Sequence, residues 1–150
     1  MDLYRRACIG RVRVELDTSA GLPPVWVDRA QLEAAILNLV VNSRDAMPEG
    51  GNIRIGVSGR ETRNPAEIGS QRRPHVCVEV RDDGDGIDPA IQHHVFEPFF
   101  TTKEVGKGSG LGLSQVFGFA AQSGGFAELE SQVGQGTAVR ICLPVGEGAA

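Results

Sequence analysis

Residues 28–47 read DRAQLEAAILNLVVNSRDAM, and this stretch decides the fold because it encodes one well-delimited helix. Asp28 can cap the first free amide groups, and Gln31 three residues later completes a capping box. Pro48 and the glycines that follow it end the helix. A stripe that recurs at helical spacing should face the core, and it comprises Leu32, Ile36, Leu39, Ser43 and Met47.

A polar stripe on the same helix is the first candidate site. Asn38, Asn42 and Asp45 are spaced four and three residues apart, so they share a face that lies nearly opposite the core stripe. Alanines and a valine flank them, where a solvated face would carry Lys and Glu. An unpaired amide among apolar neighbours costs about 1–3 kcal/mol. We therefore expect a ligand, a metal or a backbone partner there; hydrogen bonds to nearby loops are the alternative interpretation.

The elements on either side of this helix follow from the alternation of apolar residues. Strands are predicted over 11–16, 53–57, 76–80, 126–131 and 137–143, and further helices over 88–95 and 111–123. The strands at 53–57 and 76–80 should pair as neighbours. Adjacent strands mixed with three helices predict an α+β two-layer sandwich in place of a parallel βαβ sheet. We expect residues 1–10 to be a segment that leads into the domain and residues 11–150 to form one domain.

The second candidate site is the turn Asp82-Asp83-Gly84-Asp85-Gly86-Ile87 at the end of a predicted strand. A carboxylate only accepts hydrogen bonds, so Asp82 suits an exocyclic amine such as N6 of adenine and repels the carbonyl of guanine. The two glycines let a flat ligand approach the backbone closely. The glycine spacing and the missing Glu exclude an EF-hand. A plain acidic turn remains the alternative.

The third candidate site is the glycine ladder GKGSGLGL at residues 106–113, which runs directly into a predicted helix. Such a loop can aim amide groups and the helix N-terminus at phosphate oxygens, and Lys103 and Lys107 add positive charge. The spacing fits neither a Walker loop nor a dinucleotide fingerprint. A flexible linker is the alternative. A fourth motif, Gly134-Gln135-Gly136-Thr137, taken alone is an ordinary hairpin turn.

The composition excludes several classes of function. A chain of 150 residues with a net charge of −4 forms one domain and attracts nucleic acid poorly. The longest apolar run, residues 34–41, is too short to span a bilayer, and the first residues do not predict a secretory signal. The three cysteines lack metal-binding spacing and are expected to be free thiols in a reducing cytoplasm. We predict a cytoplasmic domain without nucleic-acid partners or membrane contacts of its own, whether or not the full-length protein is membrane-anchored.

Five motifs in order carry a resemblance to a known family. The Asn pair, the Asp-x-Gly-x-Gly turn, Phe96-Glu97-Pro98-Phe99-Phe100, the glycine ladder and the Gly-x-Gly-Thr turn resemble the N, first-glycine, F, second-glycine and third-glycine boxes of the histidine-kinase ATPase family. The likeness covers about residues 11–144. The sequence looks most like the subgroup that contains nitrogen-regulator sensors and many hybrid kinases. The resemblance implies the Bergerat ATPase fold, with a mixed, mostly antiparallel sheet on three helices and a mobile ATP lid.

The resemblance also implies ATP and Mg²⁺ as cofactors and assigns their contacts. Asp82 would accept the adenine amine, helped by a water that Thr137 holds, and Asn42 would coordinate Mg²⁺. Asp45 stands where many members of the family carry Lys or Arg, so this motif position lacks the positive charge found in those members. The full set implied to bind ATP comprises Asn38, Asn42, Asp45, Asp82, Gly84, Gly86, Ile87, Phe100, Thr101, Thr102, Lys103, Lys107, Gly108, Ser109, Gly110, Leu111, Gly112, Leu113 and Thr137.

No histidine in the chain has the setting of a phosphoacceptor. His75, His93 and His94 lack the helical His-Glu or His-Asp context, and His75 is expected to be a surface or hairpin residue. The resemblance therefore implies a protein-histidine kinase catalytic domain that phosphorylates a histidine on a separate dimerisation domain, upstream of a response regulator. A regulatory module without transfer is one alternative. A slow ATPase is another, because Asn38 replaces the Glu that activates water in hydrolysing relatives and cannot act as a general base.

Overall fold

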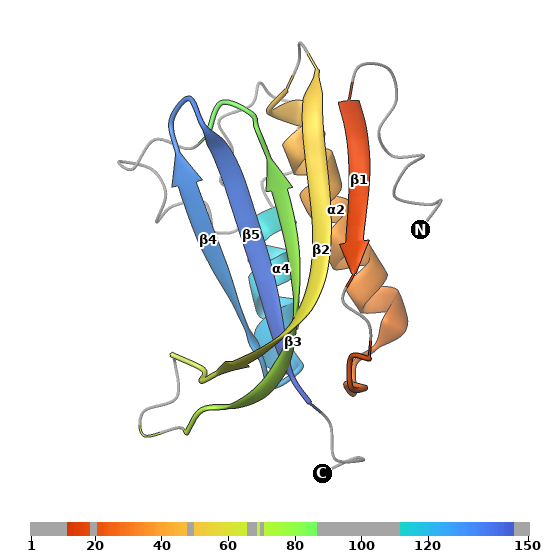
Figure 1. Cartoon of the computed structure of the whole chain (residues 1–150), viewed down its shortest axis with the longest axis vertical. Coiled ribbons are helices and arrows are strands. Elements are labelled where there is room, and N and C mark those ends of the chain that lie inside the picture. The colour runs from red at the N-terminus through yellow and green to blue at the C-terminus, as the bar shows by residue number, and fades with distance from the viewer. Residues whose placement is uncertain are drawn as a thin grey trace.

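The computed structural model describes residues 12–18, 21–47, 50–65, 69, 71–86 and 112–145. Their elements are β1 (Val12–Thr18), α2 (Arg29–Asp45), β2 (Gly51–Thr62), β3 (Arg73–Asp82), α4 (Gly112–Gln122), β4 (Phe126–Gln132) and β5 (Gly136–Pro144). The strands form one sheet in the order β1-β2-β3-β5-β4, in which β1 and β2 are parallel and the other pairs antiparallel. Both described helices lie behind one face (Figure 1).

This architecture confirms the predicted α+β two-layer sandwich with a mixed, mostly antiparallel sheet. The expected pairing of the strands around residues 53–57 and 76–80 is present as the antiparallel β2–β3 ladder. Among the described residues there are two of the three expected helices. The third, expected over 88–95, lies outside the described residues.

The helix α2 begins where its capping residue predicts. The Asp28 side chain accepts a hydrogen bond from the Gln31 backbone amide at 3.1 Å, and the helix continues to Asp45. Its buried residues are Ala35, Ile36, Leu39, Val40 and Ser43. The buried face is thus wider than the predicted stripe and reaches Ala35, because α4 packs along that side of α2.

The main core lies between the two helices and the sheet. Every second residue of the central strands points into it, because side chains alternate across a strand. Its fully buried members include Ile53 and Ile55 of β2, Val80 of β3, Ile141 of β5, and Val116 of α4. Burying one such side chain contributes about 1.5–3 kcal/mol, so this layer supplies most of the stabilisation.

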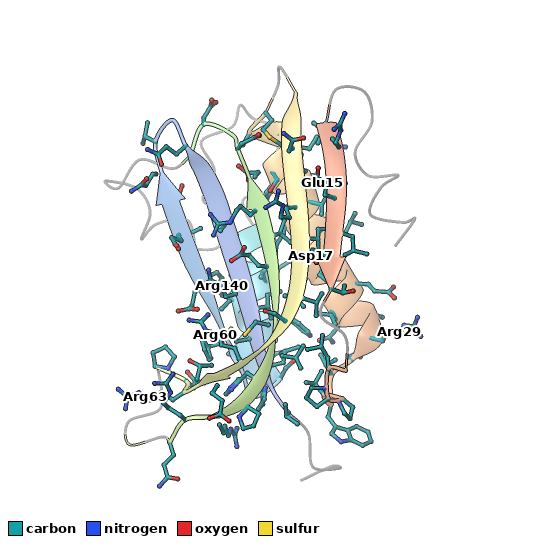
Figure 2. All side chains as sticks on the ribbon, in the orientation of Figure 1. Glu15, Asp17, Arg29, Arg60, Arg63 and Arg140 are labelled. Atoms are coloured by element: carbon teal, nitrogen blue, oxygen red, sulfur yellow. The ribbon has the colours of Figure 1, made fainter. Side chains whose placement is uncertain are left out.

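The opposite face of the sheet carries a charged ladder. The Arg140 guanidinium bonds the Glu79 carboxylate with Nη2 at 2.8 Å and Nε at 3.1 Å, and its Nη1 bonds Glu128 at 3.1 Å. The three residues come from β5, β3 and β4 and are cross-strand partners. Figure 2 shows Arg140 on the face turned away from the helices. We call this surface the open face.

One end of the open face is covered by the chain itself. The β2–β3 hairpin curls across the lower ends of β5 and β4 (Figure 1), and Asn64 Nδ2 donates to the Gly125 carbonyl oxygen at 3.2 Å. Under this hairpin lies a small second cluster formed by Cys77, Phe126 and Cys142.

The expectation that His75 is a surface histidine is wrong. Its side chain is 2% exposed, its ring meets Phe126 edge-on at 5.7 Å, and its Nδ1 donates to the Arg73 carbonyl oxygen at 2.9 Å. The hairpin location was right, but the hairpin folds back over the sheet and buries the ring.

The ladder predicts a pH-dependent stability. Burial raises the pKa of Glu79, but hydrogen bonds from Arg140 and Arg81 outweigh this effect and hold the pKa below its ordinary value of 4.5. The stabilisation is therefore fully present above pH 4.5 and is lost as the pH falls through the lowered pKa. Replacing Glu79→Gln should cost about 1 kcal/mol at neutral pH, after allowance for solvent screening.

Urea unfolding of both proteins across the acid range measures this effect, and the two stabilities should converge in acid. Glu61→Gln, at an exposed position of β2, is the matched control and should unfold with the parent at every pH. A difference between parent and Glu79→Gln that stays constant down to the acid limit would contradict a charge-based role.

Candidate functional site

A row of polar side chains crosses the helix-facing side of the sheet at one end. Ser131 of β4 pairs with Thr137 of β5, and Thr137 pairs with Asp82 of β3. Val80 and Val139 lie two residues from Asp82 and Thr137 on the same strands, so their side chains are on the same face, and both are buried in the core. The structure therefore brings the predicted site residues Asp82 and Thr137 side by side, from motifs far apart in the sequence.

Asp82 is held in place with one oxygen engaged. Its side chain is buried, and its Oδ1 accepts the Gly84 backbone amide at 2.9 Å. The second carboxylate oxygen is left to accept a hydrogen bond from a ligand. Gly84 lies against the end of α2, where an added Cβ would come within 2.9 Å of the Ala46 carbonyl oxygen. This contact fixes the distance between the acidic turn and the asparagine-bearing helix.

Two glycine turns, residues 82–86 and 132–136, pack backbone against backbone. Gly136 has a φ of +119°, and a Cβ there would collide with the Asp82 carbonyl oxygen. Gly86 has a φ of +76°, and a Cβ there would collide with the Gln132 carbonyl oxygen. The Gly134 amide donates to the Asp85 carbonyl oxygen at 2.8 Å. The Gly-x-Gly-Thr turn thus positions Thr137 against Asp82, which its sequence alone did not reveal.

Ser131 is a residue that the sequence reasoning missed. Its Oγ lies 3.1 Å from the Gly136 carbonyl oxygen and 2.8 Å from Thr137 Oγ1. Because a carbonyl only accepts, the Ser131 hydroxyl donates to it, and the Thr137 hydroxyl then donates to Ser131. Thr137 is left with acceptor capacity beside Asp82. The available signal was the hairpin register, which places Ser131 directly opposite Thr137.

Asn38, on the polar face of α2, contacts α4. Asn38 Nδ2 donates to Gln115 Oε1 of α4 at 3.4 Å, so its described partner is a helix side chain and not a loop. Asn42 lies half-buried one turn further along, and Asp45 is exposed, 3.7 Å from the Arg44 guanidinium. A groove of about 350 Å³ between the two helices is lined in part by Ala34, Ala35, Asn38, Gln115 and Phe119.

Part of the predicted site lies outside the described residues. Leu113 packs against the core from the first turn of α4, and Gly112 is the first residue of that helix. The described part of the helix therefore begins at the last glycine of the ladder, in agreement with the helix predicted over 111–123. The predicted residues outside the described ranges are Ile87, Phe100, Thr101, Thr102, Lys103, Lys107, Gly108, Ser109, Gly110 and Leu111.

The geometry has a counterpart among known proteins. Residues 27–147 match the family model described as histidine kinase-, DNA gyrase B-, and HSP90-like ATPase. The chain belongs to this family. Its members bind ATP, so the acceptor pair of Asp82 and Thr137 lies in an ATPase domain of the type found in sensor histidine kinases. In the part of the chain that the structure describes, neither helix has the length and hydropathy needed to cross a membrane.

The chain is similar to parts of longer sensor kinases. The sensor kinase CckA of Brucella abortus (strain 2308) is 45% identical over 136 residues, which are 89% of this chain and 14% of CckA. The sensory histidine kinase/phosphatase NtrB of Rhizobium meliloti (strain 1021) is 33% identical over 144 residues, 93% of this chain and 37% of NtrB. The chain thus spans well under half of the length of these relatives.

A solved structure extends the likeness to three dimensions. Full-length ShkA, determined in complex with AMPPNP, superposes with a TM-score of 0.70 at 27% identity, covering 93% of this chain and 27% of that one. The predicted family resemblance is therefore confirmed by sequence and by structure.

The hydrogen bonds of the Ser131 hydroxyl with Thr137 and with the Gly136 carbonyl oxygen predict a role for Ser131 in nucleotide affinity. Ser131→Ala removes the oxygen that accepts the hydrogen bond of the Thr137 hydroxyl, so the Thr137 side chain can rotate away from Asp82. Loss of one neutral hydrogen bond of about 0.5–1.5 kcal/mol should weaken ATP binding roughly two- to twelve-fold. Isothermal calorimetry measures the affinity. Ser58→Ala, at an exposed position of β2, is the matched control and should bind as the parent does. Equal affinities for parent and Ser131→Ala would remove Ser131 from the site.

Proposed function

We propose that this domain binds Mg-ATP and transfers the γ-phosphoryl group to a histidine on a separate dimerisation domain of the same kinase, from which a response regulator receives it. The observation that carries the proposal is the acceptor pair of the buried Asp82 and the half-buried Thr137, at the sheet end of a chain that belongs to the histidine-kinase ATPase family.

The acceptor pair favours adenine over guanine. The second oxygen of Asp82 and the lone pairs of Thr137 both need a donor, which the exocyclic amine of adenine provides directly or through a water. Guanine would present a carbonyl oxygen to the same groups and leave buried acceptors unpaired, at a cost of about 1–3 kcal/mol for each such group. Gly84 and Gly86 hold the Asp82 turn against the end of α2 and against residues 132–136, because a Cβ at either position would meet Ala46 or Gln132.

The asparagines of α2 fit the phosphate end of the ligand. Asn42 offers a hard amide oxygen, and Mg²⁺ commonly takes only one or two protein oxygens together with phosphates and water. When bound, the metal neutralises phosphate charge. Asn38 would support the same region from one turn away. The first turn of α4, which begins at Gly112 within the glycine ladder, would direct free amides toward the phosphates.

Transfer to another domain fits the histidines of this chain. His75, the histidine among the described residues, is buried and hydrogen-bonded, so its ring cannot reach a nucleotide. In the proposed reaction, an acceptor histidine nitrogen attacks the γ-phosphorus, the bond from phosphorus to the bridging oxygen breaks, and ADP leaves. This domain contributes positioning and charge neutralisation. Asn38 cannot deprotonate water, so hydrolysis should be slow.

The base contact is tested with Asp82→Asn. This change replaces a charge-assisted acceptor with a neutral amide, and such a contact is worth roughly 1.5–3 kcal/mol. ATP affinity should therefore fall about ten- to 150-fold in calorimetry, and the preference for ATP over GTP should shrink. Asp85→Asn, at an exposed position of the same turn, is the control and should retain affinity. Unchanged affinity of Asp82→Asn would remove Asp82 from the adenine contact.

The transfer reaction is tested by mixing the chain with radiolabelled Mg-ATP and the separately expressed dimerisation domain of its kinase. Label should appear on that domain, be acid-labile, and be absent when its acceptor histidine is replaced. Steady-state release of phosphate by the chain alone should be slow. ATP binding by calorimetry without any label on the dimerisation domain would exclude the kinase function, and rapid hydrolysis by the chain alone would favour an ATPase.

A further inference from the structure

Two cysteines face each other at the covered end of the open face. The antiparallel register of β3 and β5 pairs Cys77 directly with Cys142. Both thiols are free, and their side chains are 3% and 0% exposed because the β2–β3 hairpin curls over them. Their side chains lie on the same side of the sheet, directly opposite each other across the ladder. The nucleotide site does not use them, since they lie on the opposite side of the sheet from Asp82 and Thr137.

The backbone geometry of this pair allows a disulfide. Directly opposed residues of antiparallel strands have Cα atoms about 4.5 or 5.5 Å apart, depending on their place in the ladder. Disulfides span Cα distances of about 4.4–6.8 Å. Joining Cys77 to Cys142 therefore needs side-chain rotation but no shift of one strand along the other.

The surroundings shift the pKa values of the two thiols in opposite directions. The hydrogen bond with Cys142 lowers the pKa of Cys77 against the opposing effect of burial, and the guanidinium groups of Arg60 and Arg140 add to the lowering. The same hydrogen bond and burial raise the pKa of Cys142. Cys77 is thus the thiolate-forming member, and Cys142 keeps its proton. Reversible oxidation of a cysteine is favoured by a lowered pKa, a neighbouring thiol and access of the oxidant, and this pair has the first two.

Other uses of this cluster fit less well. In the described ranges no group of His, Cys, Asp and Glu side chains has the arrangement of a metal site. The His75 ring packs on Phe126 and is bonded through Nδ1 to the Arg73 carbonyl oxygen, which holds it in that position. The cover over the thiols favours an oxidant close to water in size.

We propose that Cys77 and Cys142 are an oxidation site at which hydrogen peroxide forms a reversible intramolecular disulfide. The Cys77 thiolate attacks one peroxide oxygen, the O–O bond breaks, and the leaving hydroxide takes a proton to become water. This step gives a sulfenic acid on Cys77. The Cys142 sulfur then attacks the Cys77 sulfur, the S–O bond breaks, and the departing oxygen leaves as water with the Cys142 proton. Two thiols are oxidised and one peroxide is reduced to two waters; an external dithiol reverses the change.

The bond would join the two strands that carry the acceptor pair. Asp82 ends β3, and Thr137 lies near the start of β5, so a covalent link between Cys77 and Cys142 closes the same ladder at its other end. Oxidation would therefore fix the relative position of β3 and β5 without adding a group to the nucleotide site.

The experiment uses the whole chain with Cys8→Ser, so that Cys77 and Cys142 are its only thiols. Peroxide treatment of the folded chain should abolish both thiols in an Ellman assay performed after unfolding. The intact mass should fall by two hydrogen atoms, peptide mapping should find Cys77 linked to Cys142 within one chain, and dithiothreitol should restore both thiols.

Two single variants in the same background test the order of the steps. Cys142→Ser should stop at the sulfenic acid, which dimedone traps on Cys77, whereas Cys77→Ser should leave Cys142 unreacted. Persistence of both thiols in the folded chain, under peroxide that oxidises the urea-unfolded chain, overturns the proposal. A mass gain from added oxygen in place of the disulfide, or a dimedone adduct on Cys142, also overturns it.

Discussion

The contact between the two glycine turns is the constraint on which the candidate site depends. Gly136 places its backbone against the Asp82 carbonyl, and Gly86 places its backbone against Gln132, with no room for a Cβ at either position. Both residues also adopt positive φ values, a conformation that costs other residues free energy. Close approach and backbone conformation therefore demand glycine independently. What results is a buried carboxylate and a threonine hydroxyl placed side by side on neighbouring strands.

The one-sided covering of the sheet divides the molecule into two chemical environments. On the helix side, apolar side chains fill the core and the polar row with Asp82 stands at its margin. On the open face, Arg140 holds carboxylates from two neighbouring strands, and a second buried cluster lies beneath the curled hairpin. The nucleotide chemistry and the thiol chemistry proposed here thus use the same β3–β5 ladder from opposite sides, which keeps them apart in space.

Local signals were enough to predict most of the elements. The helix starting after Asp28 was predictable because its cap and its repeat are contained within one segment. The pairing of the strands around 53–57 and 76–80 was predictable because consecutive strands usually lie side by side. Ser131 was missed because its role exists only in the register across a hairpin, where it meets Thr137. His75 was misjudged for a related reason, since no local pattern shows that a hairpin will fold back over its own sheet.

The residues of the candidate site also differ in how far the sequence alone could predict them. Asp82 and Thr137 were assigned through a family resemblance, and the structure brings them together. The wider buried face of α2, which reaches Ala35, depends on the second helix and could not be seen in the sequence of the first. The turn-to-turn contact also has a consequence for chain length. The two turns meet through backbone atoms at Gly86, Gly134 and Gly136, so residues 82–86 and 132–136 should not change in number without losing this contact.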